Sequence, residues 1–549
     1  MRLSLPLGLL GERMKEKLKE LIGTVLEKNQ IDFDFNEIVV EVPKDNSHGD
    51  YATNVAMQLA RTLKKNPREI ANLLITDLHN DDIEKVEIAG PGFINFYIKN
   101  DYLYENINTV LEKKEKYGSS NVGNRKKVNI EYVSANPTGI LHLGHARGAS
   151  YGDSLSRIMS FANYDVTREY YINDAGNQIV NLQNSIQARY EGLCGREEKM
   201  PEDGYYGKEI IDIARELKEE LGEDITDIKV FCKKGLDYLL GKIKEHLKNF
   251  RVEFDVWTSE QSIYDSGELE KTYHKLVDAG YTYEKDGAVF LKTTLYGDEK
   301  DRVLIKKDKT NTYLLPDIAY HKNKYDRGFD ELINVFGADH HGYVPRLKAS
   351  IAMLGNDPDK LDVEILQMVR LVRGKEEIKM SKRTGNAVTI ADLVEEVGLD
   401  ATRYFFSSRS LDTQLDFDME LATKQSNENP VYYIEYAYAR ISSILKEYPH
   451  AVEPLDHYET LTSEYVKNLL AKIYEFTDTV KLSAEKRSPH IIANYAYDLA
   501  GLFHTFYAHE KVLTNDETST KERINLIAAT AITIQNALRL IGVATREKM

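Results

Sequence analysis

The spacing of apolar residues along the chain changes twice, and these changes divide it into three regions. Residues 13–28 carry apolar side chains three and four positions apart, which predicts an amphipathic helix near the start. Two alternating stretches follow, at 37–42 and 92–98, and both are typical of strands. A charged and then Gly-, Ser- and Asn-rich stretch, 113–127, ends this small α+β unit.

From Val128 the pattern changes to units of strand, loop and helix. VNIEYV (128–133) is typical of a buried strand, a helix is expected after Gly144, and 167–172 has the pattern of the next strand. This alternation predicts a parallel, doubly wound sheet. A helical insertion rich in Lys and Glu is expected within it, at about 180–250.

Beyond about residue 416 the strand signals end and the chain is expected to be almost wholly helical, closing on a broad apolar stripe at 524–542. The sequence therefore predicts an α/β protein in four parts. These are a small N-terminal α+β domain (1–120), a doubly wound, Rossmann-like domain (121–385) with the helical insertion, a connector (386–415) and an all-α helical bundle (416–549).

Composition limits the class of protein. A chain of 549 residues suits three or four domains, and 42% hydrophobic with 29% charged residues is ordinary for a soluble globular protein. The net charge of −16 argues against a uniformly basic nucleic-acid coat and leaves local basic surfaces open. Two cysteines are too few for a disulfide framework or a four-cysteine zinc site, so we expect unpaired thiols and no metal site. No run reaches the ~18 apolar residues of a membrane span, and a cytoplasmic protein is expected.

A first short stretch, SANPTGILHLGHARG (134–148), carries residues suited to a nucleotide. His142 and His145 flank Gly144 where the first strand of the sheet passes into a helix. Ligands of doubly wound sheets bind at this edge, Gly144 admits a close backbone approach, and a helix N-terminus favours phosphate. For HLGH alone, two incidental histidines are an equally good explanation.

A second stretch, IKMSKRTGN (378–386), places Lys379 and Lys382 around Met380 and Ser381 in an expected loop. Lysine ammonium groups would meet the charge that develops on phosphates as pyrophosphate leaves. Two lysines alone are more often a solvated surface.

Two acidic residues are candidates for an amino-acid pocket. Glu131 lies on a predicted buried strand, where an unpaired carboxylate is costly, so we expect it to face a site. Asp317 follows Tyr313 by four residues, and a helix cap would explain it equally well. Two carboxylates and a tyrosine in one pocket would suit a guanidinium, which is planar and always charged.

In this order, HLGH and KMSKR resemble the paired signature motifs of class I aminoacyl-tRNA synthetases, with Arg383 in place of a serine. EYVSANPTG (131–139), INDAGNQ (172–178), the Tyr313-to-Asp317 spacing and GADHHGYVPRLKA (337–349) are similar to arginyl-tRNA synthetases. Residues 42–60 resemble that family's N-terminal domain, which contacts the tRNA elbow, and 429–445 resemble the start of its helical anticodon-binding domain.

The resemblance implies that the chain joins L-arginine to tRNA(Arg) through an arginyl-adenylate, releasing AMP and pyrophosphate. It further implies a monomeric cytoplasmic enzyme that uses ATP with Mg²⁺ and has no zinc site. The residues implied for arginine are Glu131, Ser134, Asn136, Tyr313 and Asp317. Those for ATP are Pro137, Thr138, Gly139, His142, Gly144, His145, His340, Met380 and Ser381, with His142, His145, Lys379 and Lys382 catalytic. Those for tRNA are Asn429, Tyr432, Tyr438, Arg440 and Met549.

Alternatives stay open at this point. The tyrosines of 429–445 either stack on RNA bases or form the packed face of a helix. Asn429 also suits a helix cap. A cysteinyl enzyme would usually carry zinc-binding cysteines, and a smaller adenylyltransferase would lack the N-terminal and helical domains. A non-catalytic RNA-binding relative would normally have lost the two loops.

Overall fold

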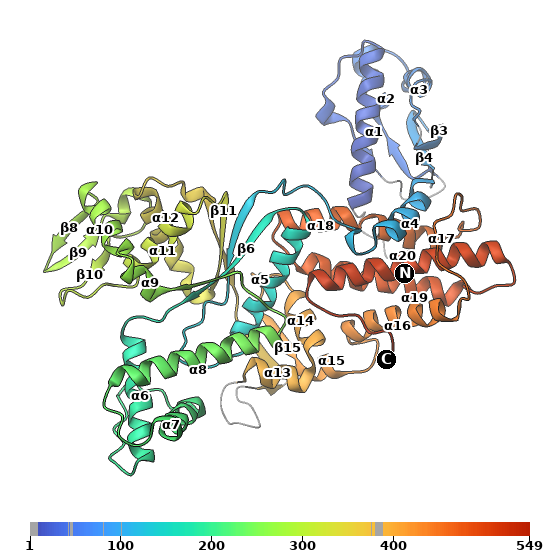
Figure 1. Ribbon diagram of the computed structural model, residues 1–549. Helices are drawn as coiled ribbons and strands as arrows, with labels where there is room; N and C mark the ends of the chain where they lie inside the picture. The colour runs from blue at the N-terminus through green and yellow to red at the C-terminus, as the bar shows by residue number, and fades with distance from the viewer. Residues whose placement is uncertain are drawn as a thin grey trace.

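The computed structural model describes residues 9–549 except 42, 44–47, 81, 100, 375 and 379–387; the side chains of 9–13, 101, 102, 339 and 341 are not described either. The predicted fold class is confirmed. A small α+β domain comes first, a parallel sheet lies at the centre, and the chain ends in packed helices (Figure 1). None of the helices in the described part has the long apolar stretch that crossing a membrane requires.

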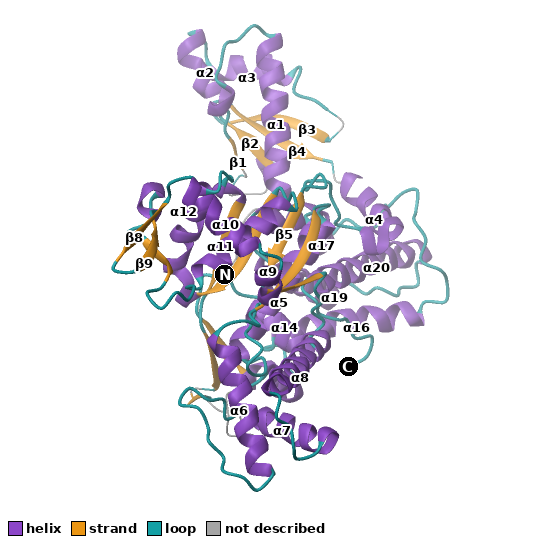
Figure 2. Ribbon diagram, turned by 60° about the vertical axis from the view of Figure 1, so that its left-hand side comes forward, coloured by secondary structure: helices purple, strands orange, loops and turns teal. Residues whose placement is uncertain are grey.

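The N-terminal domain stands apart from the body of the molecule (Figures 1 and 2) and has a hydrophobic core of its own. Its antiparallel sheet has the strand order β1-β2-β4-β3. Its elements are α1 (Leu9–Lys28), β1 (Val40–Glu41), β2 (Tyr51–Thr53), α2 (Val55–Leu63), α3 (Pro67–Ile75), β3 (Ile83–Ala89) and β4 (Phe93–Ile98). Of the strand expected at 37–42, only β1 is described as strand, because a short 3-10 turn, Phe35–Glu37, precedes it.

The central sheet is parallel throughout, with the order β12-β11-β5-β6-β7. In chain order this is the doubly wound arrangement, because successive strands are added first on one side of β5 and then on the other. Its elements are β5 (Lys127–Glu131), α5 (Leu143–Phe161), β6 (Asp165–Ile172), β7 (Val256–Ser259), α9 (Glu260–Asp265), α10 (Glu268–Asp278), α11 (Leu314–Asp326), β11 (Glu331–Gly337), α12 (Val344–Met353) and β12 (Leu361–Leu366).

Two insertions extend this domain. The expected helical insertion consists of α6 (Asn177–Leu193), α7 (Lys208–Leu221) and α8 (Ile228–Asn249), which share a separate small core. A second one, which the sequence pattern did not predict, is an antiparallel sheet of β8 (Thr282–Lys285), β9 (Ala288–Leu291) and β10 (Arg302–Ile305). Its strands have four residues each, and so short a stretch does not distinguish the alternating pattern of a strand from the pattern of a polar loop.

The rest of the chain is a small sheet followed by helices. These elements are β13 (Val369–Arg373), β14 (Glu376–Glu377), α13 (Ile390–Val397), α14 (Leu399–Ser407), β15 (Leu415–Asp418), α15 (Met419–Thr423), α16 (Pro430–Glu447), α17 (Glu464–Tyr474), α18 (Phe476–Glu485), α19 (His490–His509) and α20 (Glu517–Leu540). Helix α4 (Asp101–Lys113) and the turn after it dock on this helical region. There the hydroxyls of Tyr104 and Tyr117 donate to the carbonyls of Leu461 (2.8 Å) and Ile473 (2.7 Å).

Helix α5 lies between the sheet and the C-terminal helices. The ring of Tyr132, at the end of β5, is fully buried against Gly152 of α5. A Cβ atom on Gly152 would lie 2.1 Å from that ring, so only glycine admits this close packing of strand and helix. The packing fixes where α5 begins relative to the sheet.

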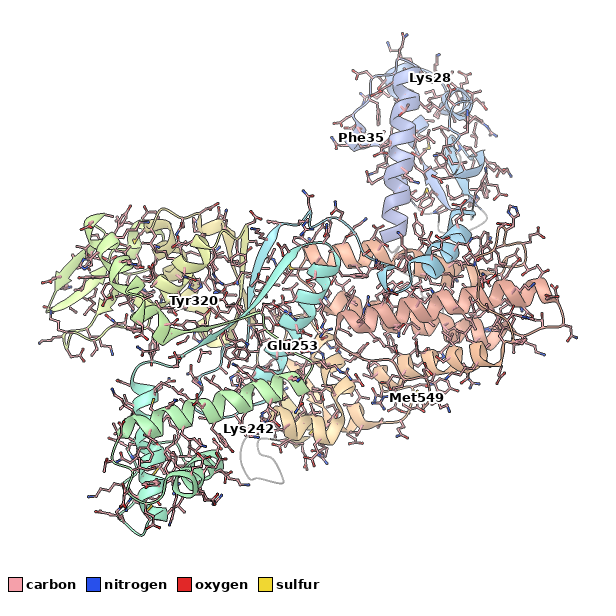
Figure 3. All side chains as sticks on the ribbon, in the orientation of Figure 1. Lys28, Phe35, Lys242, Glu253, Tyr320 and Met549 are labelled. Atoms are coloured by element: carbon pink, nitrogen blue, oxygen red, sulfur yellow. The ribbon has the colours of Figure 1, made fainter. Side chains whose placement is uncertain are left out.

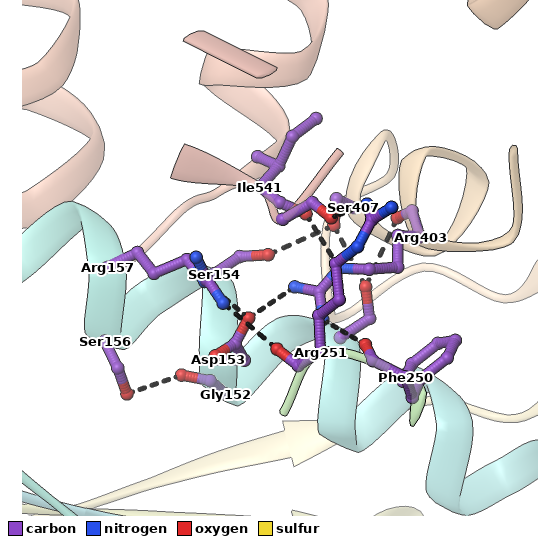
Figure 4. Close-up of polar contacts among 12 residues, drawn as sticks. Gly152, Asp153, Ser154, Ser156, Arg157, Phe250, Arg251, Arg403, Ser407 and Ile541 are labelled. Atoms are coloured by element: carbon purple, nitrogen blue, oxygen red, sulfur yellow. Dashed lines mark hydrogen bonds and ion pairs between the residues drawn. The ribbon is translucent and has the colours of Figure 1, made fainter. Parts of the chain in front are cut away.

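A buried ion pair joins α5 to three other segments (Figure 4). Asp153 of α5 and Arg403 of α14 both have side chains that are 0% exposed and lie 2.5 Å apart. Arg403 also donates to the carbonyls of Phe250 (2.9 Å), just after α8, and Ile541 (3.1 Å), just after α20. Arg157 of α5 donates to the same carboxylate oxygen at 2.7 Å. Helix α5 is thus connected by buried polar contacts to the insertion and to the end of α20.

Replacing Asp153 by Asn should destabilise the protein strongly. The substitution leaves the guanidinium of Arg403 buried without its counter-charge, which typically costs about 3–5 kcal/mol. We expect a clear fall in Tm by differential scanning calorimetry. Asp416→Asn is the control, because its pair with Arg370 is half exposed and should matter little. Equal melting temperatures for the two variants would contradict this account.

Candidate active site

The loop that follows β5 has a strained backbone at the carboxyl edge of the sheet. Val133 (φ 68°) and Ser134 (φ 38°) both adopt left-handed conformations, which are unfavourable for residues other than glycine and rare for a β-branched one. Two hydrogen bonds fix Ser134: its hydroxyl donates to Glu131 Oε1 at 2.9 Å and accepts from the backbone N–H of Tyr171 at 3.1 Å. Strain of this kind is typical of ligand-binding loops.

The two histidines of HLGH cap helix α5. The N–H of Gly144 donates to His142 Nδ1 at 3.1 Å, and the N–H of His142 donates to His145 Nδ1 at 3.2 Å. Each Nδ1 is therefore an acceptor, and each ring carries its proton on Nε2. Loss of surrounding water lowers the pKa of His142 and lowers that of His145 to about 3, so both are neutral donors at pH 7. Neutral Nε2–H groups at a helix N-terminus suit phosphate oxygens.

The segment after KMSKR pairs directly with HLGH. The N–H of Leu143 donates to the Val388 carbonyl (3.2 Å), and that of Ile390 donates to the Leu141 carbonyl (3.1 Å). Four of the predicted residues, Lys379, Met380, Ser381 and Lys382, lie outside the described residues. The residue after their segment is nevertheless fixed beside the start of α5.

The remaining nucleotide candidates lie in or near the same edge. Pro137 is buried, Thr138 and Gly139 are half-buried, and Asn136 is exposed in the loop between β5 and α5. The exposed ring of His340 lies 5.6 Å from the Phe336 ring and 6.3 Å from the Tyr343 ring, after β11. These candidates therefore lie on one continuous loop, between β5 and α5, and just after the neighbouring strand β11.

Three carboxylates lie near one buried phenol beside this loop. Tyr171 of β6 is 8% exposed, and Glu260 is the acid beside its hydroxyl. Burial raises the pKa of Tyr171, and Asp317, Glu260 and Glu131 raise it further. The three acids come from three elements: the first turn of α11, the first residue of α9 and the end of β5. We call Tyr171 and these three acids the acidic pocket.

The charges of two of these acids are poorly compensated. Burial raises the pKa of Asp317 to about 7; a hydrogen bond from the Tyr343 hydroxyl opposes this shift, and Glu131 and Glu260 add to it. Burial also raises the pKa of Glu260, which is 5% exposed. Carboxyls whose ionised form is disfavoured for lack of a neighbouring cation are what a cationic ligand would bind.

The carboxylate of Glu131 is paired in the structure. It is buried, and Lys324 of α11 donates to its Oε2 at 2.5 Å, so its charge is already matched. Tyr313 is 62% exposed at the start of α11, and Tyr343 is the tyrosine that bonds Asp317. Whether Tyr313 contacts a ligand stays a prediction.

Sequence reasoning missed Tyr171, Glu260 and Tyr343. The sheet brings Tyr171 and Glu260 together, because they lie at the carboxyl ends of the adjacent parallel strands β6 and β7. The stretch VWTSE was a usable signal for Glu260, a strand with an acid directly after it, but β7 has only four residues.

A second candidate surface lies on the helical region. We call Tyr432, Tyr436 and Arg440 of α16 with Tyr497, His504 and Tyr507 of α19 the aromatic strip. The rings of Tyr432 and Tyr436 stack at 6.3 Å, that of Tyr436 stacks on His504 at 5.8 Å, and Arg440 lies over the rings of Tyr436 and Tyr507. Tyr497 and Tyr507 are 41% and 37% exposed. Flat rings beside a cation at the surface suit unpaired bases.

The other tRNA candidates have different surroundings. Asn429 is 4% exposed; it caps α16, and its amide also donates to the carbonyls of Ala422 and Lys424 (both 3.0 Å), so the cap interpretation is the better one. Tyr438 packs against the main core. Met549 is 52% exposed at the C-terminal end, beside α16 (Figures 1 and 3).

A doubly wound sheet with a doubly capped HLGH helix at its switch point, followed by a helical bundle, defines a class I aminoacyl-tRNA synthetase. Comparison with protein families agrees. Residues 106–406 match the family described as tRNA synthetases class I (R), catalytic domain. Residues 13–98 match the arginyl tRNA synthetase N terminal domain, and 434–549 match the DALR anticodon binding domain.

Individual relatives show which family within this class the chain resembles. The arginine–tRNA ligase of Bacillus subtilis is 53% identical over 555 residues, covering 98% of this chain and 100% of that protein. That of Geobacillus thermodenitrificans is 52% identical, covering 98% and 99%. The solved arginyl-tRNA synthetase of Thermus thermophilus, at 21% identity, has the same fold, with a TM-score of 0.72 over 98% of this chain and all of that one. The chain belongs to the arginine–tRNA ligase family.

Replacing Asp317 by Asn should stabilise the ligand-free protein at alkaline pH. The folded-state pKa of about 7 lies above the ordinary 3.8, so Asp317 stabilises the fold at low pH, and this contribution is lost as pH rises through 7. Asn avoids the buried charge, and we expect a gain of about 1–3 kcal/mol at pH 8 and a smaller gain at pH 5, because the loss of stability begins near pH 3.8 and is complete above pH 7. Urea unfolding at both pH values measures it. Asp326→Asn, at the exposed end of α11, is the control; a similar gain there would refute the assignment.

Proposed function

We propose that this protein attaches L-arginine to tRNA(Arg) in two steps. First an oxygen of the arginine carboxylate bonds to the α-phosphorus of ATP, and the bond to pyrophosphate breaks. A terminal ribose hydroxyl of the tRNA then attacks the carbonyl carbon of arginyl-adenylate, and AMP leaves. Positioning and electrostatic stabilisation supply the catalysis in both steps, without a covalent enzyme intermediate.

The acidic pocket carries this proposal. Asp317 and Glu260 are carboxylates of raised pKa with too little positive charge beside them, and a guanidinium supplies both the charge and up to five donors in one plane. An uncharged isostere such as citrulline would leave two buried carboxyls without a cation and should be rejected strongly. Glu131, Ser134, Asn136 and Tyr313 would hold the rest of the amino acid.

The nucleotide would bind beside this pocket, over the loop 136–145. His142 and His145 would donate from Nε2 to phosphate oxygens, and Gly144 and Gly139 allow the phosphates to lie close to the backbone. Lys379 and Lys382, with Met380 and Ser381, would close over the pyrophosphate side, because their segment is continuous with Val388 next to α5. His340 would flank the adenylate.

Mg²⁺ would enter with the nucleotide. No group of three or more His, Cys, Asp or Glu side chains among the described residues is placed to hold a metal, so its ligands would be phosphate oxygens and water. Such an ion neutralises phosphate charge. We assign it no protein ligand, and we propose no zinc site.

The aromatic strip would bind the anticodon loop, together with Met549 and Tyr438. The N-terminal domain would contact the tRNA elbow. We place the domain boundaries at 120, 385 and 415, and propose a monomeric enzyme of the cytoplasm, where charged tRNA is used.

ATP–pyrophosphate exchange with each of the twenty amino acids, with and without total tRNA, tests the reaction. We expect exchange with arginine alone, and only when tRNA is present. Exchange with a different amino acid would refute the acidic pocket, and no exchange under any condition would favour a non-catalytic relative.

Glu260→Gln should raise the KM for arginine about 100-fold or more, because a buried charge-assisted pair is lost. The KM for ATP should stay near its wild-type value.

Replacing Tyr436 by Ala should weaken tRNA binding. Stacking of a base on an aromatic side chain contributes about 1–3 kcal/mol, so the KM for tRNA should rise about 5- to 100-fold. The KM for arginine at saturating tRNA should not change. Tyr436→Phe keeps the ring and should stay close to wild type in aminoacylation. If the Ala and Phe variants are impaired equally, stacking is not the interaction.

A further inference from the structure

A lysine is buried completely in the floor of the acidic pocket. Lys324, in the third turn of α11, is 0% exposed. Its ammonium group donates to Glu131 Oε2 at 2.5 Å and to Asn334 Oδ1 at 3.0 Å, and it lies 4.6 Å from the centre of the Tyr320 ring. A buried ammonium is costly even when paired, and an apolar residue would usually serve stability as well. Its presence needs another reason.

The lysine begins a chain of hydrogen bonds that has one consistent direction. The Asn334 amide and His321 Nε2 are 2.7 Å apart, and His321 Nδ1 lies 2.8 Å from the backbone carbonyl of Asp317. The carbonyl can only accept, so Nδ1 carries the proton and Nε2 accepts from Asn334. Burial, and after it Lys324, lowers the pKa of His321 to about 4, so the ring is neutral as this arrangement requires.

This network fixes two carboxylates of the pocket relative to each other. It runs from Glu131 at the end of β5, through Asn334 on β11, to the first turn of α11 that carries Asp317. The second oxygen of Glu131 accepts from the Ser134 hydroxyl, so neither oxygen of this carboxylate is free to turn. The orientation of Glu131 is set before any ligand enters.

The ammonium group also acts on the neighbouring acid of α11. Burial, Glu131 and Glu260 raise the pKa of Asp317, and Lys324 opposes this rise.

We propose that Lys324 is a positioning residue for arginine recognition, which acts by holding the Glu131 carboxylate in one orientation through a buried, charge-assisted hydrogen bond. This inference rests on the proposed function. It assigns to Lys324 no contact with arginine or ATP.

Lys324→Met tests the proposal, because Met has nearly the same length and no charge. We expect the KM for arginine in tRNA aminoacylation to rise about 10- to 100-fold, with kcat at saturating arginine and the KM for ATP changed less than about 3-fold. Lys322→Met is the matched control: Lys322 lies two residues earlier on α11 and pairs with the exposed Asp326. It should behave as wild type.

A double-mutant cycle with Glu131→Gln separates this role from a purely structural one. If Lys324 acts through Glu131, the double variant should have the KM for arginine of Glu131→Gln alone. Effects of the two substitutions that multiply, or equal rises in the KM values for arginine and ATP, would overturn the proposal. So would an unchanged KM for arginine in folded Lys324→Met.

Folding is checked by circular dichroism, and Lys324→Gln, which is polar but shorter and uncharged, replaces the Met variant if that one does not fold. The results expected for Lys324→Gln, and those that would contradict the proposal, are the same as for Lys324→Met. Wild-type enzyme that shows no arginine-dependent activity would refute the proposed function itself, which distinguishes that failure from a failure of this inference.

Discussion

A carboxylate in a dry interior needs a compensating charge, and the organisation of this protein depends on where that compensation is supplied and where it is not. Asp153 is matched by Arg403, and Glu131 by Lys324, in pairs that are almost completely buried. Among the residues that the structure describes, Asp317 and Glu260 have no ion-pair partner, and burial raises the pKa of each. The same physical rule therefore separates carboxylates that hold the structure together from carboxylates that are ready for a cationic ligand.

The parallel sheet brings these uncompensated groups next to the loop that carries HLGH. All five strands end at one edge, so the residues after β5, β6 and β7 meet there even though β5 and β7 lie more than a hundred positions apart in the chain. The strained turn at Val133 and Ser134 lets the chain leave β5 and reach the capped start of α5. An amino acid and ATP that bind to these neighbouring loops would have their reacting groups close together, which is much of what this reaction needs.

The helical region is attached to α5 and to the sheet by polar side-chain contacts. Arg403 links α5 to the ends of α8 and α20, and Arg487, in the turn between α18 and α19, bonds Glu331, Asp362 and Glu364 of β11 and β12. A displacement of the C-terminal helices would have to break charged contacts that also hold the sheet and the HLGH helix. The aromatic strip and the acidic pocket are consequently connected through one set of packed elements.

The amino-acid sequence by itself determined the fold class, the doubly wound sheet, the helical insertion and the loop that carries His142 and His145. These depend on local periodicity and on short motifs, which neighbouring residues determine. Lys379 and Lys382 were found by the same means, and their placement lies outside the described residues. The sequence also singled out Glu131 and Asp317, yet it could not distinguish their roles, because the compensating charge of Glu131 comes from a residue 193 positions away. Only the tertiary structure decided that Glu131 is paired, that Glu260 and Tyr171 complete the pocket, and that Asn429 is a cap, since each depends on which strands become neighbours and on how much water reaches the side chain.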